Sequence, residues 1–176
     1  MSAVLAEQLA EQLLDLTGDQ RQGLPTPVFR LVSQLTPMIN VDLLVRDTAG
    51  RTLLTWRADE FYGPGWHIPG GIIRFKENIA TRITKVAEME LGCTVGFLPQ
   101  PIAIHEIMAP HRDVRGHFIS LLYVCTLRTP PATHLQASDT PSGHGQWQWH
   151  DSCPKNLISV HEIYRRYINP SLPDTL

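Results

Sequence analysis

The sequence predicts a single α+β domain, because several segments with the pattern of β-strands surround one central helix and precede one late helix. The length of 176 residues suits one ordinary domain, and 43% hydrophobic residues are enough to form a core. The expected strands cover residues 40–46, 51–56, 102–108, 117–127 and 146–149, the first two forming a hairpin through the turn residues 47–50, and the expected helices cover 78–91 and 158–167.

The central helix is predicted from the spacing of its apolar residues, which recur near i, i+4, i+7 and i+8 as in a stripe that faces a core. Before the helix, the pair Gly70–Gly71 is predicted to form a tight turn, and after it Gly92 is the type of residue that ends a helix. At about 100° per residue, Glu90 falls within this stripe and Glu88 on the opposite side. An ionised carboxylate that faces a core needs a cation or hydrogen-bond donors. From the residues alone, Glu90 either serves a site, pairs with a buried arginine, or lies at the edge of the stripe.

Two helices are predicted before the first strand. An amphipathic helix over residues 2–17 ends at Gly18, and a second short helix over 27–35 follows a polar turn. The first helix either packs on the same domain or serves as a dimerisation arm, because its leucines need burial somewhere. We expect an N-terminal helical extension (1–38), a main domain (39–170) and a tail (171–176). The leucines of the first helix are Leu5, Leu9, Leu13, Leu14 and Leu16.

The composition argues against several classes of partner. A net charge of −2 and a pI of about 6.4 do not suggest a nucleic-acid-binding or membrane-binding surface. The three cysteines, Cys93, Cys125 and Cys153, are scattered and lack metal-ligand spacing, so they are interpreted as reduced thiols of a cytoplasmic protein. Neither a signal peptide nor a membrane-spanning segment is predicted.

Several polar residues stand out as candidates for a site. Asp42 lies within an apolar strand, where the simpler interpretation is that its carboxylate points outward. Arg57 follows a strand and precedes the loop 58–65, a common position for an anion ligand. The polar loop 110–116 is rich in cationic or protonatable groups, and His144 lies between two glycines.

The residues around the central helix resemble the Nudix box, in which a glycine, three acids or bases and a second glycine recur at fixed spacing. This resemblance implies the Nudix fold, a mixed sheet between helices with the box as loop–helix–loop. It also implies that the glutamate early in the box pairs with the base that follows it, here Glu77 with Lys85. The matching residues are Gly71, Glu77, Lys85, Glu90 and Gly92.

Two acids of the box are missing, because Val86 and Met89 stand where most of the family has glutamates that act as general base or metal ligand. The GDP-mannose mannosyl hydrolases show the same two losses, and the resemblance to that branch extends over about residues 40–167. The branch also carries an arginine where this chain has Ile72 and a glutamine where it has Gly143. These two departures favour a degenerate domain that no longer catalyses.

The resemblance to this branch implies a role in metal binding, substrate binding or catalysis for several residues. Glu90 and the carbonyl of Gly70 would hold Mg²⁺, with Mn²⁺ as an alternative. Arg57 would steady the departing diphosphate, and Asp42 would lie beside the nucleotide end. His144 would act as the base for water that attacks the anomeric carbon of the sugar. The residues that would support the substrate or the water are His111 and His161.

Three functions remain open from the sequence. The first is a hydrolase that releases a sugar and a nucleoside diphosphate from a sugar nucleotide such as GDP-mannose. The second is a Nudix pyrophosphatase that attacks phosphorus in another nucleoside diphosphate derivative. The third is a non-catalytic Nudix domain that binds a nucleotide or a protein. For the first two, the partner is a small-molecule substrate.

Overall fold

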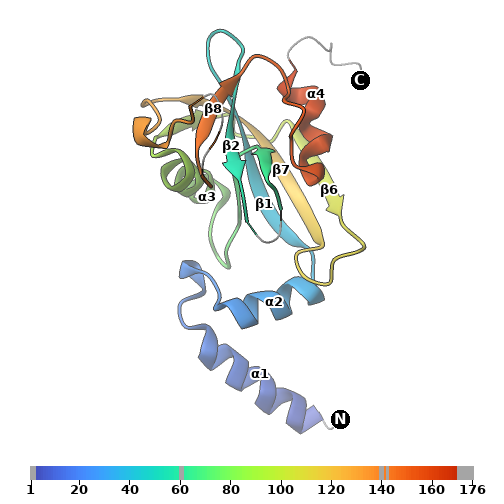
Figure 1. Cartoon of the computed structure of the whole chain (residues 1–176). Helices are drawn as coiled ribbons and strands as arrows, with labels where there is room; N and C mark the ends of the chain where they lie inside the picture. Colours follow the sequence, from blue (N-terminus) through green and yellow to red (C-terminus); the bar gives the residue numbers. More distant parts are fainter. Residues whose placement is uncertain (1–2, 60–61, 139–140, 142, 170–176) are drawn as a thin grey trace.

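The computed structural model describes residues 3–59, 62–138, 141 and 143–169, and these form a mixed sheet with helices on both sides. The predicted α+β class is confirmed (Figure 1). The strand β1 lies within the sheet, runs parallel to β7 and pairs antiparallel with β2 and β4. The bounds of these strands are Met38–Arg46 (β1), Thr52–Arg57 (β2), Gly70–Ile72 (β4) and His117–Leu127 (β7).

The predicted hairpin between β1 and β2 is confirmed, and its turn is stabilised by Asp47. The Asp47 carboxylate accepts hydrogen bonds from the backbone N–H groups of Ala49 and Arg51 at 3.0 and 2.9 Å. This is a turn that aspartate favours because its side chain replaces a missing backbone partner. Residues 41–45 of β1 are all buried, as expected for a strand covered on both faces.

The remaining strands extend the sheet on either side of this centre. Strands β5 and β6 pair with β7, while β3 and β8 pair with β2. The predicted strands over 102–108 and 146–149 correspond to β6 and β8. The bounds are Gly65–His67 (β3), Val95–Phe97 (β5), Ala103–Met108 (β6) and Trp147–His150 (β8).

The glycine pair Gly70–Gly71 was predicted to form a tight turn, and this is wrong. Both glycines lie in β4, opposite Asp42 and Val41 of β1. A Cβ atom on Gly70 would lie 2.1 Å from Oδ1 of Asp42, which no real contact allows. Glycine is therefore needed here because the strand passes close to a buried carboxylate.

The central helix begins as α3 (Ile79–Val86) and continues as a π-helical turn, η2 (Ala87–Leu91). Asn78 caps its N-terminus, since its side-chain oxygen accepts the backbone N–H of Thr81 at 2.8 Å. Gly92 ends it with a left-handed backbone (φ 61°), as predicted. Apolar residues of this helix pack on one face of the sheet.

The predicted late helix is a 3₁₀ segment, η4 (Ser159–Tyr164), followed by the short helix α4 (Arg165–Ile168). Its buried residues join a second apolar cluster with Trp66 and Leu122. The two clusters make the sheet the middle layer of the domain (Figure 1). Among the described residues of the segment 129–144, Thr133–Leu135 form a 3₁₀ turn, η3.

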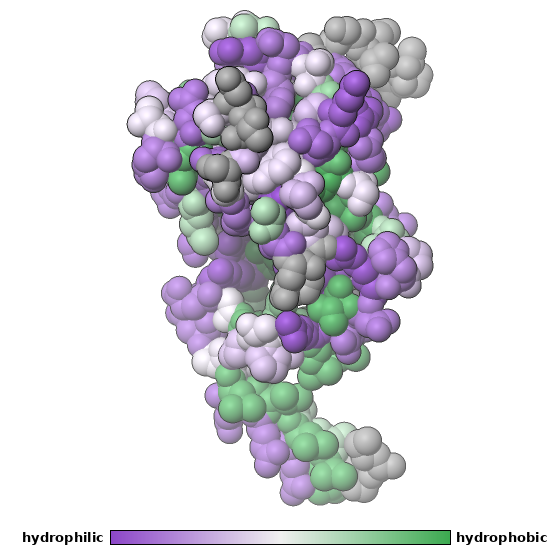
Figure 2. Space-filling view, viewed as in Figure 1, coloured by the Kyte–Doolittle hydropathy of each residue, from purple (hydrophilic) through white to green (hydrophobic). Residues whose placement is uncertain are grey.

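The helices before β1 are α1 (Ala3–Thr17), η1 (Gln20–Gln22) and α2 (Thr26–Leu35). Figure 1 shows α2 beside one end of the sheet and α1 extending away from the sheet. Every described residue of α1 except Thr17 is exposed, so this helix does not pack on the main domain. Apolar side chains gather along it in the space-filling view (Figure 2).

The division of the chain near residue 38 stays a prediction. Ser2, the first residue of the predicted helix, and the predicted tail 171–176 lie outside the described residues. Within the described part of the chain, the search for a helix that is both long enough and apolar enough to cross a bilayer finds none.

Candidate active site

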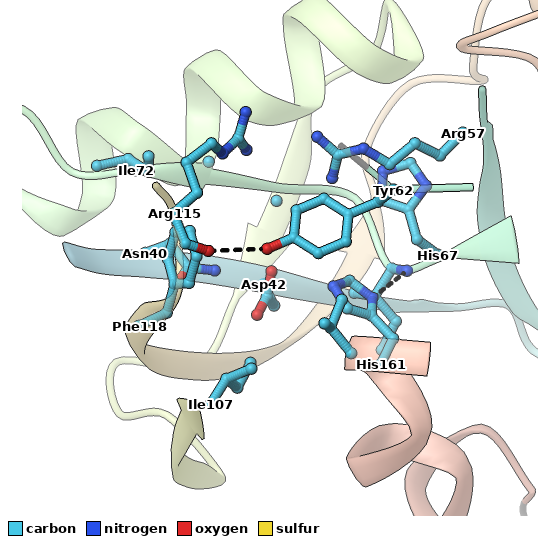
Figure 3. Close-up of a pocket in the computed structure, with 14 residues that line it drawn as sticks. Asn40, Asp42, Arg57, Tyr62, His67, Ile72, Ile107, Arg115, Phe118 and His161 are labelled. Atoms are coloured by element: carbon cyan, nitrogen blue, oxygen red, sulfur yellow. Dashed lines mark hydrogen bonds between the residues drawn. The ribbon is translucent and has the colours of Figure 1, made fainter. Parts of the chain in front are cut away.

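A cavity of about 160 Å³ opens beside the strands β1 and β4 and is lined mainly by polar and cationic side chains (Figure 3). Strand β1 contributes Asp42, the end of β2 contributes Arg57, and η4 contributes His161. The fold therefore brings together three of the predicted site residues, of which His161 is more than a hundred positions from the other two in the sequence. Ile72, where the resembling branch has an arginine, also lines the cavity.

The Asp42 side chain points inward, so the simpler interpretation of an outward carboxylate is wrong. Its exposed fraction is 2%, and its Oδ2 accepts hydrogen bonds from the hydroxyls of Ser120 and Tyr164. Burial raises the pKa of Asp42 to about 6, although these two hydroxyl donors and the charge of Arg57 oppose the rise.

Glu90 also turns into the protein, whereas Glu88 is exposed, so the predicted orientation of the two acids is confirmed. Oε1 of Glu90 accepts the backbone N–H of Gly70 at 3.3 Å, and its Oε2 accepts the Thr55 hydroxyl at 3.4 Å. Burial raises the pKa of Glu90 to about 7. The ion pairs of the described residues include no arginine or lysine at this carboxylate, so pairing with a buried arginine does not explain its position.

His67 is a site residue that the sequence reasoning missed. Its Nδ1 donates to the carbonyl of Thr55 at 2.8 Å, so its Nε2 carries a lone pair and lies 3.7 Å from Oε2 of Glu90. Burial lowers the pKa of His67 to about 3, which keeps the ring neutral. Its position in the lead-in Trp66–Gly70 of the box was the only signal in the sequence.

The groups around Glu90 fit a divalent cation. In the described part of the chain, this partly buried carboxylate has two long hydrogen bonds, faces a neutral imidazole and contacts no cation. Mg²⁺ prefers one or two carboxylates, carbonyl oxygens and water. Among the described residues no cluster of three or more His, Cys, Asp or Glu side chains is placed to hold a metal, so a site here would use Glu90, backbone oxygen at Gly70 and water.

Arg57 lies at the rim of the cavity. Its Nε donates to Oδ2 of Asp59 at 2.6 Å, and its guanidinium lies 5.2 Å from the centre of the Tyr62 ring. These contacts fix the cation at the end of β2, beside the loop that was predicted to cover a pocket. A guanidinium held in this way can bind a phosphate with two parallel hydrogen bonds.

The predicted histidines lie at different distances from the cavity. His161 lines it and is buried, and its Nδ1 accepts the backbone N–H of Ile68 at 3.1 Å. Burial lowers the pKa of His161 well below its ordinary value, so the ring is neutral. His144 is exposed beside Arg57, and its Nδ1 accepts the backbone N–H of Ala58 at 3.2 Å. His111 is exposed in the loop between β6 and β7 and does not line the cavity.

Glu77 is the early glutamate of the box, and its ion pairs attach the loop before the central helix to that helix. The predicted pair with Lys85 is present, with Nζ at 3.2 Å from Oε1. A closer partner that the sequence reasoning missed is Arg82, whose Nε and Nη2 each lie 2.7 Å from Oε2 of Glu77.

Gly143 stands where the resembling branch has a glutamine. Its backbone N–H donates a hydrogen bond to Oε1 of Gln146 at 3.0 Å.

Comparison with known proteins gives a consistent result. A family model described as the NUDIX domain matches residues 36–152. The low-salt glycan biosynthesis protein Agl8 from Haloferax volcanii is 28% identical over 121 residues, which cover 62% of this chain and 76% of that protein.

Two solved structures share the fold. A MutT NUDIX hydrolase from Burkholderia pseudomallei aligns with a TM-score of 0.57 and 19% identity, over 76% of this chain and 99% of that one. A possible asymmetric diadenosine tetraphosphate hydrolase from Jonesia denitrificans aligns with a TM-score of 0.51 and 22% identity, over 66% of this chain and 77% of that one.

Proposed function

The chain belongs to the Nudix hydrolase family, and from this premise we propose that it hydrolyses a sugar nucleotide such as GDP-mannose to the free sugar and a nucleoside diphosphate. The observation that carries this proposal is that Glu90 is the one acid on residues 79–91 that turns into the protein, where its carboxylate contacts Gly70 and His67 of the cavity wall. The similarity to a protein named for glycan biosynthesis supports a sugar-linked substrate.

Attack on phosphorus needs a strong base or several metal ligands on the box helix, and this helix offers neither. Val86 is buried so close to Gly71 that a Cβ atom added to Gly71 would lie 2.8 Å from Cγ2 of Val86. Met89 is 73% exposed. Attack on the anomeric carbon expels an intact nucleoside diphosphate, which is a good leaving group. This reaction therefore needs less activation at phosphorus and suits a site with fewer acids.

Nudix hydrolases generally use divalent metal ions, and Mg²⁺ at Glu90 and Gly70 would neutralise charge on the departing diphosphate. The residues of the chain then supply the rest of the chemistry. Arg57 binds the diphosphate from the rim of the cavity. Asp42, buried near the same cavity, lies beside the nucleotide end of the substrate.

His144 is the proposed base for the attacking water. Its Nδ1 accepts the N–H of Ala58, so the neutral ring carries its proton on Nε2 and has its lone pair on Nδ1. It can accept a proton only after the bond to Ala58 opens. The neighbouring Gly145 has a backbone that other residues rarely adopt (φ 83°), and this allows the loop to bring His144 next to Arg57.

The proposal is tested by hydrolysis of a panel of sugar nucleotides with Mg²⁺ in ¹⁸O-labelled water. We expect the label in the released sugar, because the water bonds to carbon. His144→Ala should lower kcat by about 100-fold or more, within the range for loss of a general base. His134→Ala is the matched control, since it also removes an exposed histidine, which lies in η3, and should leave kcat unchanged.

Other outcomes of this experiment distinguish the alternatives. Label in the phosphate would exclude attack on carbon and would support a pyrophosphatase. Saturable nucleotide binding without turnover on any substrate would support a non-catalytic domain, which the residues Ile72 and Gly143 favour. Full activity of His144→Ala would remove the base assignment even if the label enters the sugar.

We also propose that two copies of this cytoplasmic enzyme associate through α1. Within the structure, Leu9 and Leu13 lie on one exposed side of this helix, with exposed fractions of 45% and 38%. We expect Leu9→Gln/Leu13→Gln to convert a dimer to a monomer in sedimentation velocity. The control Gln8→Glu/Gln12→Glu changes the polar side and should remain dimeric. A monomeric wild type would reject the association.

A further inference from the structure

The loop between β6 and β7, residues 109–116, is rich in cationic groups that the proposed reaction does not yet use. It is closed tightly, because Ala109 N–H donates to the carbonyl of Gly116 at 2.7 Å and Arg112 N–H donates to the carbonyl of Ala109 at 2.9 Å. Within this loop Arg115 adopts a left-handed backbone with φ of 56°. A residue other than glycine adopts this conformation only where surrounding contacts hold it there.

Both backbone groups of Arg115 are held by side chains from distant parts of the chain. Its N–H donates to Oγ of Ser33 on α2 at 3.3 Å, and its carbonyl accepts the hydroxyl of Tyr62 at 3.0 Å. Ser33 is 6% exposed and its hydroxyl also donates to the carbonyl of Arg30, which fixes its position on the helix. Ser33 of α2 and Tyr62 therefore both help to hold the backbone of Arg115 in this conformation.

The side chain of Arg115 is directed to the cavity. It lines the same cavity as Arg57, and Figure 3 shows the two guanidinium groups on the same rim with the ring of Tyr62 between the side chains. Its guanidinium lies 5.9 Å from the Tyr62 ring and 5.8 Å from the ring of Phe29 on α2. Burial and then the like charge of Arg57 lower the pKa of Arg115.

The like charge of Arg57 disfavours the charged form of Arg115 and the carboxylate of Asp59 favours it, and a bound polyanion would add further negative charge beside both guanidinium groups. A diphosphate carries enough negative charge to engage both guanidinium groups. Ile72 lines this cavity and supplies no charge. A second cation for the phosphates therefore has to come from another element, and Arg115 lies on the same rim of the cavity as Arg57.

We propose that Arg115 binds the diphosphate of the substrate together with Arg57, and that Ser33 of α2 is a positioning residue for it. The proposal rests on the proposed function for its substrate, since it takes a nucleoside diphosphate as the ligand. It gives the N-terminal extension a role in the site, because α2 determines where the Arg115 side chain lies.

The first test is calorimetric titration of the full chain with GDP and, separately, with guanosine. Arg115→Asn removes the charge while keeping a residue type that accepts the left-handed backbone. We expect GDP affinity to fall about 10–100-fold, the range for a hydrogen bond to a charged group, while guanosine affinity stays unchanged. Arg115→Lys should keep part of the affinity, and Arg128→Asn, which removes an exposed arginine elsewhere, should bind GDP as wild type does.

The second test asks whether Ser33 acts through Arg115. Ser33→Ala should weaken GDP binding in the wild-type background but not in the Arg115→Asn background, and Ser33→Thr should restore the affinity. Unfolding midpoints of all variants identify any loss that comes from a destabilised fold. An equal loss in both backgrounds would overturn the positioning role of Ser33.

These outcomes separate this proposal from the proposed reaction. Wild-type GDP affinity in a folded Arg115→Asn variant would overturn the role of Arg115, even if labelled oxygen enters the sugar. Weakened GDP binding together with label in the phosphate would sustain Arg115 as a diphosphate ligand and reject attack on carbon.

Discussion

Glu90→Gln is expected to lose Mg²⁺-dependent turnover by roughly 100-fold or more, because even residues that only support a metal ligand are typically worth 10–100-fold in metal affinity. The glutamine keeps the size of the side chain and an oxygen that can accept the N–H of Gly70. It removes the negative charge that faces His67 across 3.7 Å. The loss should therefore come from metal binding and not from a disturbed fold.

The measurement is turnover as a function of Mg²⁺ concentration, together with direct binding of Mn²⁺ followed by its paramagnetic resonance signal. Glu88→Gln is the matched control, since it removes the same group two residues earlier on the exposed side of the helix. It should behave as wild type in both measurements. If the two variants have the same metal dependence, Glu90 is not the metal ligand.

Periodicity along a single element accounts for what the sequence predicted well. Glu90 and Glu88 are two residues apart, so a helix of 3.6 residues per turn places them on opposite sides. The hairpin between β1 and β2 was predicted from its turn residues, and Gly92 from the need for a left-handed backbone. Each of these features depends on neighbours in the sequence, which is why a sequence without a structure reveals them.

The features that the sequence did not reveal depend on contacts between distant elements. His67 becomes a site residue because β2 supplies the carbonyl of Thr55 and the central helix supplies Glu90. The inward direction of Asp42 depends on the hydroxyl of Tyr164, which lies 122 residues later. Neither spacing nor composition records such contacts, so periodicity could not determine which way these side chains point.

The partner of Glu77 shows the same difference within one motif. The resemblance to the box identified Lys85, and that ion pair exists, but the Lys85 side chain is 40% exposed. The side chains of Arg82 and Glu77 are each only 5% exposed, and they meet at 2.7 Å. Burial decides which contact matters for stability, because water screens an exposed pair and does not screen a buried one.

Arg82→Met is therefore expected to lower the free energy of unfolding by about 3–5 kcal/mol, the cost of leaving one member of a buried ion pair without its partner. Lys85→Met, the matched control, should cost about 1 kcal/mol or less. The measurement is urea unfolding at pH 7, completed by Glu77→Gln and the double variant Glu77→Gln/Arg82→Met. The double variant should be more stable than the sum of the two single losses predicts, because it removes both buried charges.

The pH dependence gives an independent check of the same pair. Burial alone would raise the pKa of Glu77, but hydrogen bonds from the backbone of Arg74 and from the side chains of Arg82 and Lys85 outweigh burial and lower it. A carboxyl group whose folded pKa is depressed contributes stability above its unfolded pKa of 4.5 and loses that contribution as the pH falls. The difference between wild type and Arg82→Met should therefore be full at pH 7 and shrink below about pH 4.5. A difference that stays constant with pH, or a loss in Lys85→Met as large as that in Arg82→Met, would show that Arg82 stabilises the box by packing and not by its charge.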